Sequence, residues 1–198
     1  MKTHSKRVKR ENFWGKYEGN IPIELKEMVF EQYYSQDTLF VYCDSSCSKV
    51  GSDMAIACTY VINGSIFVKN KFFHSPEDCI GKNIFGELKA VLFALKNFNR
   101  CLGRLYDNVI IFSDVNDIKR ILLNKMVFKN NDSLRKLQAE LITLYKEKKK
   151  DNPEISIEIE YLPLNLKMHN PFMKASHNAS RKLMKRNYNR KLLGDKNE

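Results

Sequence analysis

The sequence of 198 residues predicts an α/β protein with one mixed sheet of five strands, three antiparallel and then parallel, flanked by helices. The first observation behind this prediction is Asn63-Gly64, which joins two strand-like segments and is a strong hairpin signal. The second is the later alternation of strand and helix patterns, which is typical of parallel strands joined by helical crossovers. The third is a hydrophobic fraction of 43%, which supplies a core and excludes a mostly disordered chain.

Each element follows from its local pattern. β-Branched, aromatic or alternating residues predict strands over 38–48, 54–62, 65–73, 107–114 and 155–162. Helical spacing of apolar residues predicts a short flanking helix over 21–34 and helices over 83–99, 115–124, 132–149 and from about Pro171 past Met184. Asp132-Ser133 is expected to cap the 132–149 helix, and Asn170 the last one.

Positive charge is concentrated at both ends of the chain. Residues 1–20 hold six Lys or Arg and two Glu, and residues 165–198 hold nine Lys or Arg and two acids, whereas residues 21–164 are neutral. We expect a basic N-terminal arm and flanking helix over 1–35, one domain over 36–190 and a C-terminal tail over 191–198. Such ends suit a nucleic acid, although a tail that only improves solubility would show the same pattern.

The basic N-terminal arm also holds a small aromatic cluster of Phe13, Trp14 and Tyr17. Two interpretations are open for it. The rings could stack on nucleic-acid bases, or they could pack onto the domain as an ordinary hydrophobic patch.

The sequence shows no sign of a membrane or secreted protein. No apolar run approaches the roughly 20 residues of a membrane span, and no apolar segment follows the basic start as in a secretory signal. The five cysteines are odd in number and form no CxxC pair, which indicates reduced thiols and no structural zinc site. We therefore expect a cytoplasmic protein that needs no membrane.

Three acids stand at unusual places in the predicted fold. Asp44 lies within an apolar strand, Glu87 lies just inside the first long helix, and Asp114 ends the fourth strand. Neighbouring buried carboxylates are costly unless a cation neutralises them. Salt bridges would explain any one of them, but three together on adjoining elements indicate a site for a hard divalent ion such as Mg²⁺.

The motifs around these acids resemble the ribonuclease H family. CDSSC at 43–47, ELKAVLFAL at 87–95 and FSDVNDIKRIL at 112–122 are similar to its three acidic motifs, in the same order and on the same elements. The resemblance covers roughly residues 38–187. It implies a ribonuclease H-like fold and an enzyme that cleaves the RNA strand of RNA/DNA hybrids with two Mg²⁺ ions, or Mn²⁺ in their place.

The resemblance also implies a role for each acid. Asp44 would bridge two metal ions, Glu87 would hold one and help orient the scissile phosphate, and Asp114 would hold an ion near the attacking water. One ion then activates the water and the other stabilises the leaving oxygen. Ser45 stands where many members have glycine, and Ser45 and Ser46 would lie beside the nucleic-acid backbone.

The fourth acid of the family's metal site is missing, since no Asp or Glu occurs from Tyr161 to Gly194. The segment KASHNASRKL at 174–183 resembles the family's closing motif and puts His177 at that place. Ser176 takes it under a shift of one residue, and a surface role for His177 is also open. His169, in the preceding loop, is either the family's mobile histidine or an ordinary loop residue.

The last helix is a candidate phosphate contact through Arg181 and Lys185, with a solvated helix face as the alternative. The leading hypothesis is a hybrid-cleaving endonuclease that acts as a monomer without an obligate protein partner. Two others remain: a nucleic-acid-binding module on the same fold with impaired catalysis, favoured by the missing acid, and a nuclease of the superfamily acting on DNA.

Overall fold

The computed structural model describes residues 11–48, 51–100 and 106–194. Its centre is a five-stranded sheet in the order β3-β2-β1-β4-β5. The strands are β1 (Thr38–Cys47), β2 (Asp53–Ile62), β3 (Ser65–His74), β4 (Asn108–Ser113) and β5 (Ser156–Tyr161). β1 and β3 pair with β2 antiparallel, whereas β4 is parallel to both β1 and β5, which confirms the predicted mixed sheet.

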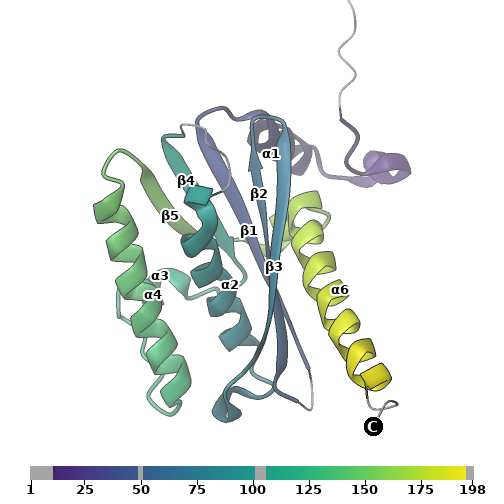
Figure 1. The fold of residues 1–198 in the computed structure, drawn as a ribbon. Helices are drawn as coiled ribbons and strands as arrows, with labels where there is room; N and C mark the ends of the chain where they lie inside the picture. Colours follow the sequence, from purple (N-terminus) through teal and green to yellow (C-terminus); the bar gives the residue numbers. More distant parts are fainter. Residues whose placement is uncertain (1–10, 49–50, 101–105, 195–198) are drawn as a thin grey trace, which may run out of the picture.

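Helices cover both faces of this sheet (Figure 1). One face carries α2 (Asn83–Asn97), α3 (Ile118–Leu122) and α4 (Asp132–Asp151), and the other carries α1 (Ile23–Tyr34) and α6 (Pro171–Gly194). Shorter turns are α5 (Leu164–Lys167) and the 3₁₀ segments η1 (Gly15–Asn20), η2 (Glu77–Cys79) and η3 (Phe98–Arg100). α5 and the 3₁₀ segments were not predicted, because single turns have no apolar period.

Alternation along β1 divides the core between the two faces. Leu39, Val41 and Cys43 point toward α2 and belong to the larger core cluster. Tyr42 points the other way, into a second cluster with α1 and α6. Side chains that follow in the strand continue this alternation. Asp44 is therefore on the α6 side of the sheet.

The second cluster fastens the N-terminal segment to the domain. Leu25 and Val29 of α1 are buried against Val61 of β2 and Phe172 of α6. The predicted flanking helix is thus confirmed, beginning two residues later than expected because Pro22 precedes it as the N-cap. Residues 1–10, which hold five basic residues of the predicted arm, and residues 195–198, the end of the predicted 191–198 tail, lie outside the described residues.

The hairpin between β2 and β3 turns at Asn63 and Gly64, as predicted. Their φ angles are 44° and 69°, the left-handed values that such a tight turn needs and that Asn and Gly tolerate. The expected cap of α6 is also confirmed, since Oδ1 of Asn170 accepts hydrogen bonds from the backbone of Phe172 at 2.9 Å and Met173 at 3.1 Å.

The expected cap of α4 was wrong by one residue. The N-cap is Asn131, whose Oδ1 accepts a 2.7 Å hydrogen bond from the backbone of Leu134. Its Nδ2 also donates to the carbonyl of Asp78 at 2.6 Å. This second, long-range partner explains why Asn131 rather than Asp132-Ser133 occupies the cap.

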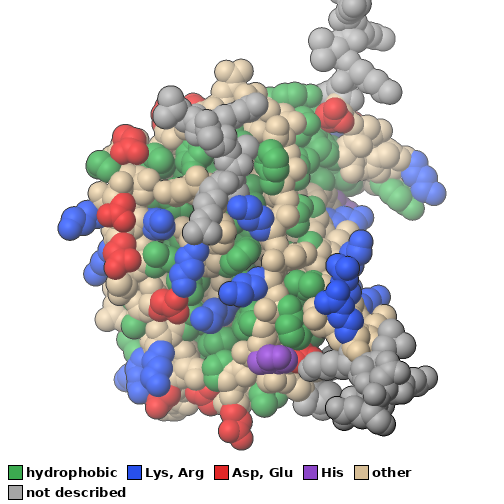
Figure 2. All heavy atoms as spheres, viewed as in Figure 1, with side chains coloured by type: hydrophobic (Ala, Val, Ile, Leu, Met, Phe, Trp, Pro, Cys, Tyr) green, Lys and Arg blue, Asp and Glu red, His purple; other side chains and the backbone are tan. Residues whose placement is uncertain are grey.

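Ion pairs join α2 to α4 on their shared face of the sheet. Figure 2 shows basic side chains gathered over the middle of this face, between α4 and β3. Lys89 and Lys96 of α2 lie 3.6 and 2.6 Å from the carboxylate of Glu140 on α4. These bonds hold α2, which carries Glu87, against α4.

Across the residues that the structure describes, no helix combines the length and the apolar character that crossing a bilayer requires.

Candidate active site

Asp44 is held from the α6 side of the sheet. Its Oδ2 accepts a 2.8 Å hydrogen bond from the hydroxyl of Ser180, and Nδ1 of His177 lies 3.4 Å from the same oxygen. Asp44 is only 5% exposed. Burial raises its pKa, while the Ser180 hydroxyl and the nearby His177 act in the opposite direction.

Glu87 is held from the other side of the same strand. Because successive strand residues face opposite ways, Ser45 points toward α2, and its hydroxyl donates a 2.8 Å hydrogen bond to Oε1 of Glu87. α2 can approach β1 this closely because Gly86 has no side chain. A Cβ there would stand 2.6 Å from Oγ of Ser45.

The carboxyl group of Glu87 is both buried and close to another acid. Burial and then the charge of Asp44 raise its pKa to about 8. Its second oxygen, Oε2, is buried and accepts no hydrogen bond within the described part of the chain. Glu87 is therefore protonated over much of the neutral range unless a cation comes to it.

Asp114 directly follows β4, at the carboxyl end of the parallel pair. Its Oδ2 accepts a hydrogen bond from Nζ of Lys167, at the end of α5. Both side chains are about one-third exposed. In this structure Lys167 thus supplies the positive charge beside Asp114.

The three acids open onto one cleft of about 950 Å³. The cleft is also lined by the N-terminal segment and by the β5–α6 loop with the start of α6. The described residues around it are Phe13, Trp14, Tyr17, Asn20, Ile21, Asp44, Ser45, Glu87, Asp114, Leu164, Lys167, Met168, His169, Asn170, Pro171, Met173, Lys174, Ala175, His177 and Asn178. Asp44, Glu87 and Asp114 come from three separate elements, and all three line this cleft.

The donor set suits a hard divalent ion at Asp44 and Glu87. The unpartnered Oε2 of Glu87 and the mutual repulsion of the two carboxylates are both relieved by a cation. Within the described ranges, no three His, Cys, Asp or Glu side chains stand close enough together to hold an ion as they are. Completing such a site requires Asp114 to exchange Lys167 for the ion.

The two residues considered for the fourth position point in different directions. His177 lies at the cleft beside Asp44 and is about half exposed. Ser176 is fully buried, and its hydroxyl donates to the carbonyl of Tyr42 at 2.7 Å and contacts Thr59 at 2.7 Å. Ser176 thus binds α6 to the sheet, and neither of these hydroxyl contacts is with an acid.

The other predicted site residues divide in the same way. His169 lines the cleft and has a left-handed φ of 65°. Arg181 and Lys185 line a separate hollow of about 360 Å³, which adjoins the cleft at Asn178. Ser46 follows Ser45 in β1 and is absent from the described lining of either hollow.

Sequence reasoning missed three contacts of the site. Ser180 reaches Asp44, Lys167 reaches Asp114, and the indole of Trp14 donates to the carbonyl of His169 at 2.7 Å. The partners are separated by 136, 53 and 155 residues. One signal was present for Ser180, which lies four residues after Ser176 and hence on the same helix face.

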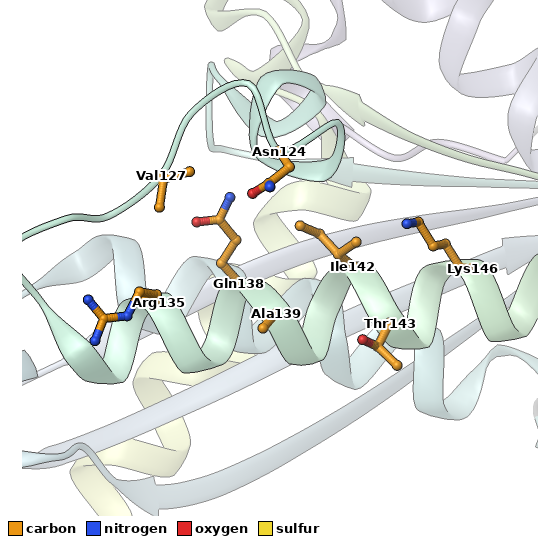
Figure 3. Close-up of a pocket in the computed structure, with 8 residues that line it drawn as sticks. All are labelled: Asn124, Val127, Arg135, Gln138, Ala139, Ile142, Thr143 and Lys146. Carbon is orange, nitrogen blue, oxygen red and sulfur yellow. The ribbon is translucent and has the colours of Figure 1, made fainter.

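Another hollow, of about 300 Å³, lies on α4 and differs from the cleft in its chemistry (Figure 3). It is lined by Asn124, Val127, Arg135, Gln138, Ala139, Ile142, Thr143 and Lys146, a set without any acid. Gln138 here is structural, because its amide donates to the carbonyls of Ile121 at 3.1 Å and Met126 at 2.6 Å. The acidic cleft is therefore the stronger candidate for catalysis.

Solved structures with the same architecture are known, although no family model and no curated protein matches the sequence. RNase H1 from the halophilic archaeon Halobacterium salinarum NRC-1 is 15% identical, with a TM-score of 0.52, over 70% of this chain and 93% of that one. LC11-RNase H1, isolated from compost by a metagenomic approach, is 16% identical, with a TM-score of 0.51, over 73% and 99%. At these identities the likeness shows a shared fold.

Proposed function

We propose, from the ribonuclease H-like fold that this chain has, that it is a divalent-metal-dependent endonuclease that hydrolyses the RNA strand of RNA/DNA hybrids. The observation that carries the proposal is the meeting of Asp44, Glu87 and Asp114 at one cleft. The sequence motifs that resemble the family select the same three acids. A likeness of fold alone would not place acids on these three elements.

The cation would be held by Asp44, Glu87 and Asp114, with His177 at the fourth position. When bound, such an ion, Mg²⁺ or Mn²⁺, would lower the pKa of the attacking water and neutralise charge on the leaving oxygen. Hard carboxylate oxygens suit both metals, and an imidazole shifts the preference toward Mn²⁺.

The surrounding residues orient these acids and the substrate. Ser45 holds Oε1 of Glu87, which leaves Oε2 without a hydrogen-bond partner in the described part of the chain and available to a cation, and Ser180 fixes Oδ2 of Asp44. We expect Arg181 and Lys185, which line the adjoining hollow, to contact substrate phosphates. Ser45 and Ser46 keep the chain small beside the nucleic-acid backbone.

The test is cleavage of an end-labelled RNA/DNA hybrid beside RNA duplex, DNA duplex and single strands, with Mg²⁺, Mn²⁺ or a chelator. We expect hybrid-specific cutting that needs the metal and is lost in Asp44→Asn. The matched control is Asp117→Asn, since Asp117 pairs with Arg120 on the surface at 2.9 Å and does not line the cleft. Cutting of the DNA duplex instead would identify a nuclease acting on DNA.

One observation favours a second candidate, a nucleic-acid-binding module with impaired catalysis. Lys167 neutralises Asp114, and the start of α6 supplies His177 in place of an acid. A module of this kind would bind the hybrid tightly and cut it with neither metal. That result would contradict the enzyme proposal.

A further inference from the structure

The N-terminal segment forms one wall of the acidic cleft. Phe13, Trp14 and Tyr17 line the same cleft as the acids, and we call these three residues the aromatic wall. They precede the central sheet in sequence and belong to no strand of it. Their position at the cleft therefore calls for a role of its own.

Two residues of the aromatic wall are structural. The ring of Phe13 packs edge-on against Tyr33 and Phe172, with centroids 5.0 and 5.5 Å away. The indole of Trp14 donates to the carbonyl of His169, which ties the wall to the β5–α6 loop. For Phe13 and Trp14, packing onto the domain is thus the interpretation that the contacts support.

Tyr17 differs from both. It is 60% exposed although it lines the cleft. Nζ of its neighbour Lys16 lies 5.2 Å from the ring centroid, so a cation and an aromatic face are presented together. The sequence before Glu11 holds five further Lys or Arg, a composition that suits a polyanion.

An aromatic ring with an adjacent cation is the usual combination for binding single-stranded nucleic acid. The base faces within a duplex are hidden in its own stack, so away from the duplex ends an exposed ring can stack only on unpaired bases. We propose that Tyr17 and Lys16 bind an unpaired strand that extends from a hybrid lying at Asp44, Glu87 and Asp114. This inference rests on the proposed function, because it takes the acids as the place of the paired region.

The proposal assigns a preferred substrate class, namely hybrids that adjoin a single strand. The experiment measures fluorescence anisotropy with Asp44→Asn as the uncleaving background. The probes are a blunt RNA/DNA hybrid and four hybrids with a short extension on either strand at either end. We expect Tyr17→Ala to weaken binding of at least one extended hybrid by about five- to fifteenfold. Binding of the blunt hybrid should change less than about twofold, because it offers no unpaired base.

Further variants separate stacking from charge. Tyr17→Phe keeps the aromatic ring, so it should bind extended hybrids with the affinity that Tyr17→Ala loses. The salt dependence of that affinity should not change. Lys16→Ala should lower the slope of log affinity against log salt by about one. Tyr34→Ala is the matched control, since Tyr34 is 48% exposed on α1 and does not line the cleft.

The outcomes separate this proposal from the proposed function. Equal loss for blunt and extended hybrids, or no loss in Tyr17→Ala, would overturn the single-strand assignment even if the wild-type protein cleaves hybrids. Tyr17-dependent binding of extended hybrids by a wild-type protein that cuts nothing would support the assignment and sink the enzyme. No binding of any probe would overturn the single-strand assignment.

Discussion

The hydroxyl of Ser180 donates a 2.8 Å hydrogen bond to Oδ2 of Asp44, joining α6 to β1 across 136 residues of sequence. This bond opposes the effect of burial on the pKa of Asp44. Ser180→Ala should therefore raise that pKa further and move the acidic limb of the cleavage profile to higher pH. The free energy of unfolding should fall by about 1.5–3 kcal/mol, as for a lost bond to a charged group.

Ser176→Ala is the control for this prediction, because Ser176 lies one helical turn earlier and is equally buried. The hydroxyl of Ser176 donates to the carbonyl of Tyr42 and bonds none of the three acids. Its loss should lower stability by a similar amount without moving the pH profile. A shift of equal size in both variants would contradict a specific role for Ser180.

Gly86→Ala tests the close approach of α2 to β1. The new Cβ would stand 2.6 Å from Oγ and 2.9 Å from Cβ of Ser45, so Ser45 must move and its bond to Glu87 is lost. We expect a loss of about 1–3 kcal/mol in the free energy of unfolding and a drop in cleavage. Gly19→Ala, where nothing lies within 4 Å, should leave denaturant unfolding unchanged.

Glu87→Gln tests the raised pKa of Glu87 without relying on activity. In chelator, the folded state holds a proton on Glu87 between the usual value near 4.5 and about 8, where the unfolded state has released it. Wild-type stability should therefore fall as pH rises through this window. Glu87→Gln should remove the fall and be more stable than wild type at pH 8 by about 1–3 kcal/mol.

Glu140 provides a control of opposite sign. Its pairing with Lys96 and Lys89 outweighs burial and lowers its pKa. Its contribution to stability is present above the usual carboxyl range and is lost as pH falls. Glu140→Gln should thus lower stability near pH 8, and a gain there would show that Glu87→Gln acts by a general effect of removed charge.

His177→Asp restores an acid to the place where the family resemblance expects one. His177 lies 3.4 Å from Asp44, so a carboxylate there would add a hard ligand to the same site. We expect Mg²⁺ to raise the melting temperature at about tenfold lower concentration than in wild type. The control is His177→Asn, because asparagine has the size of aspartate but no charge. If Mg²⁺ raised the melting temperature equally in both variants, position 177 would be excluded from the metal site.

Lys167→Gln tests the exchange of a lysine for a metal ion at Asp114. Removing the competing cation should tighten Mg²⁺ binding by about two- to tenfold, the size of a partly exposed ion pair. Lys174→Gln removes the same charge from the same cleft, but Lys174 does not pair with Asp114. Calorimetric titration of both variants measures the effect, and weaker binding in Lys167→Gln would mean that Lys167 supports the ion.

Local chemistry explains which parts of this fold could be predicted. Asn63-Gly64 and Asn170 act through their own backbone neighbours, so the sequence alone was sufficient. The cap of α4 was misplaced because Asn131 gains a partner in Asp78, which lies 53 residues away. The three acids were predicted from their place on central elements and from the family resemblance.

The remaining parts of the site depend on contacts that no local pattern encodes. Ser180 is one of several polar residues in a basic helix, and only the packing of α6 on β1 aims it at Asp44. Lys167 lies in a single turn with no apolar period, and its partner is fixed by the meeting of β4 with the β5–α6 loop. Trp14 could be placed only once the N-terminal segment was seen to fold back onto that loop.

The turn at Asn63 and Gly64 also completes another element. Their amides donate 2.7 Å hydrogen bonds to the carbonyls of Ser35 and Tyr33, at the end of α1. Because α1 ends here, no further turn of the helix provides amides for those carbonyls. α1 is therefore completed by a hairpin that lies later in the sequence, and its last carbonyls gain these partners only when β2 and β3 are joined.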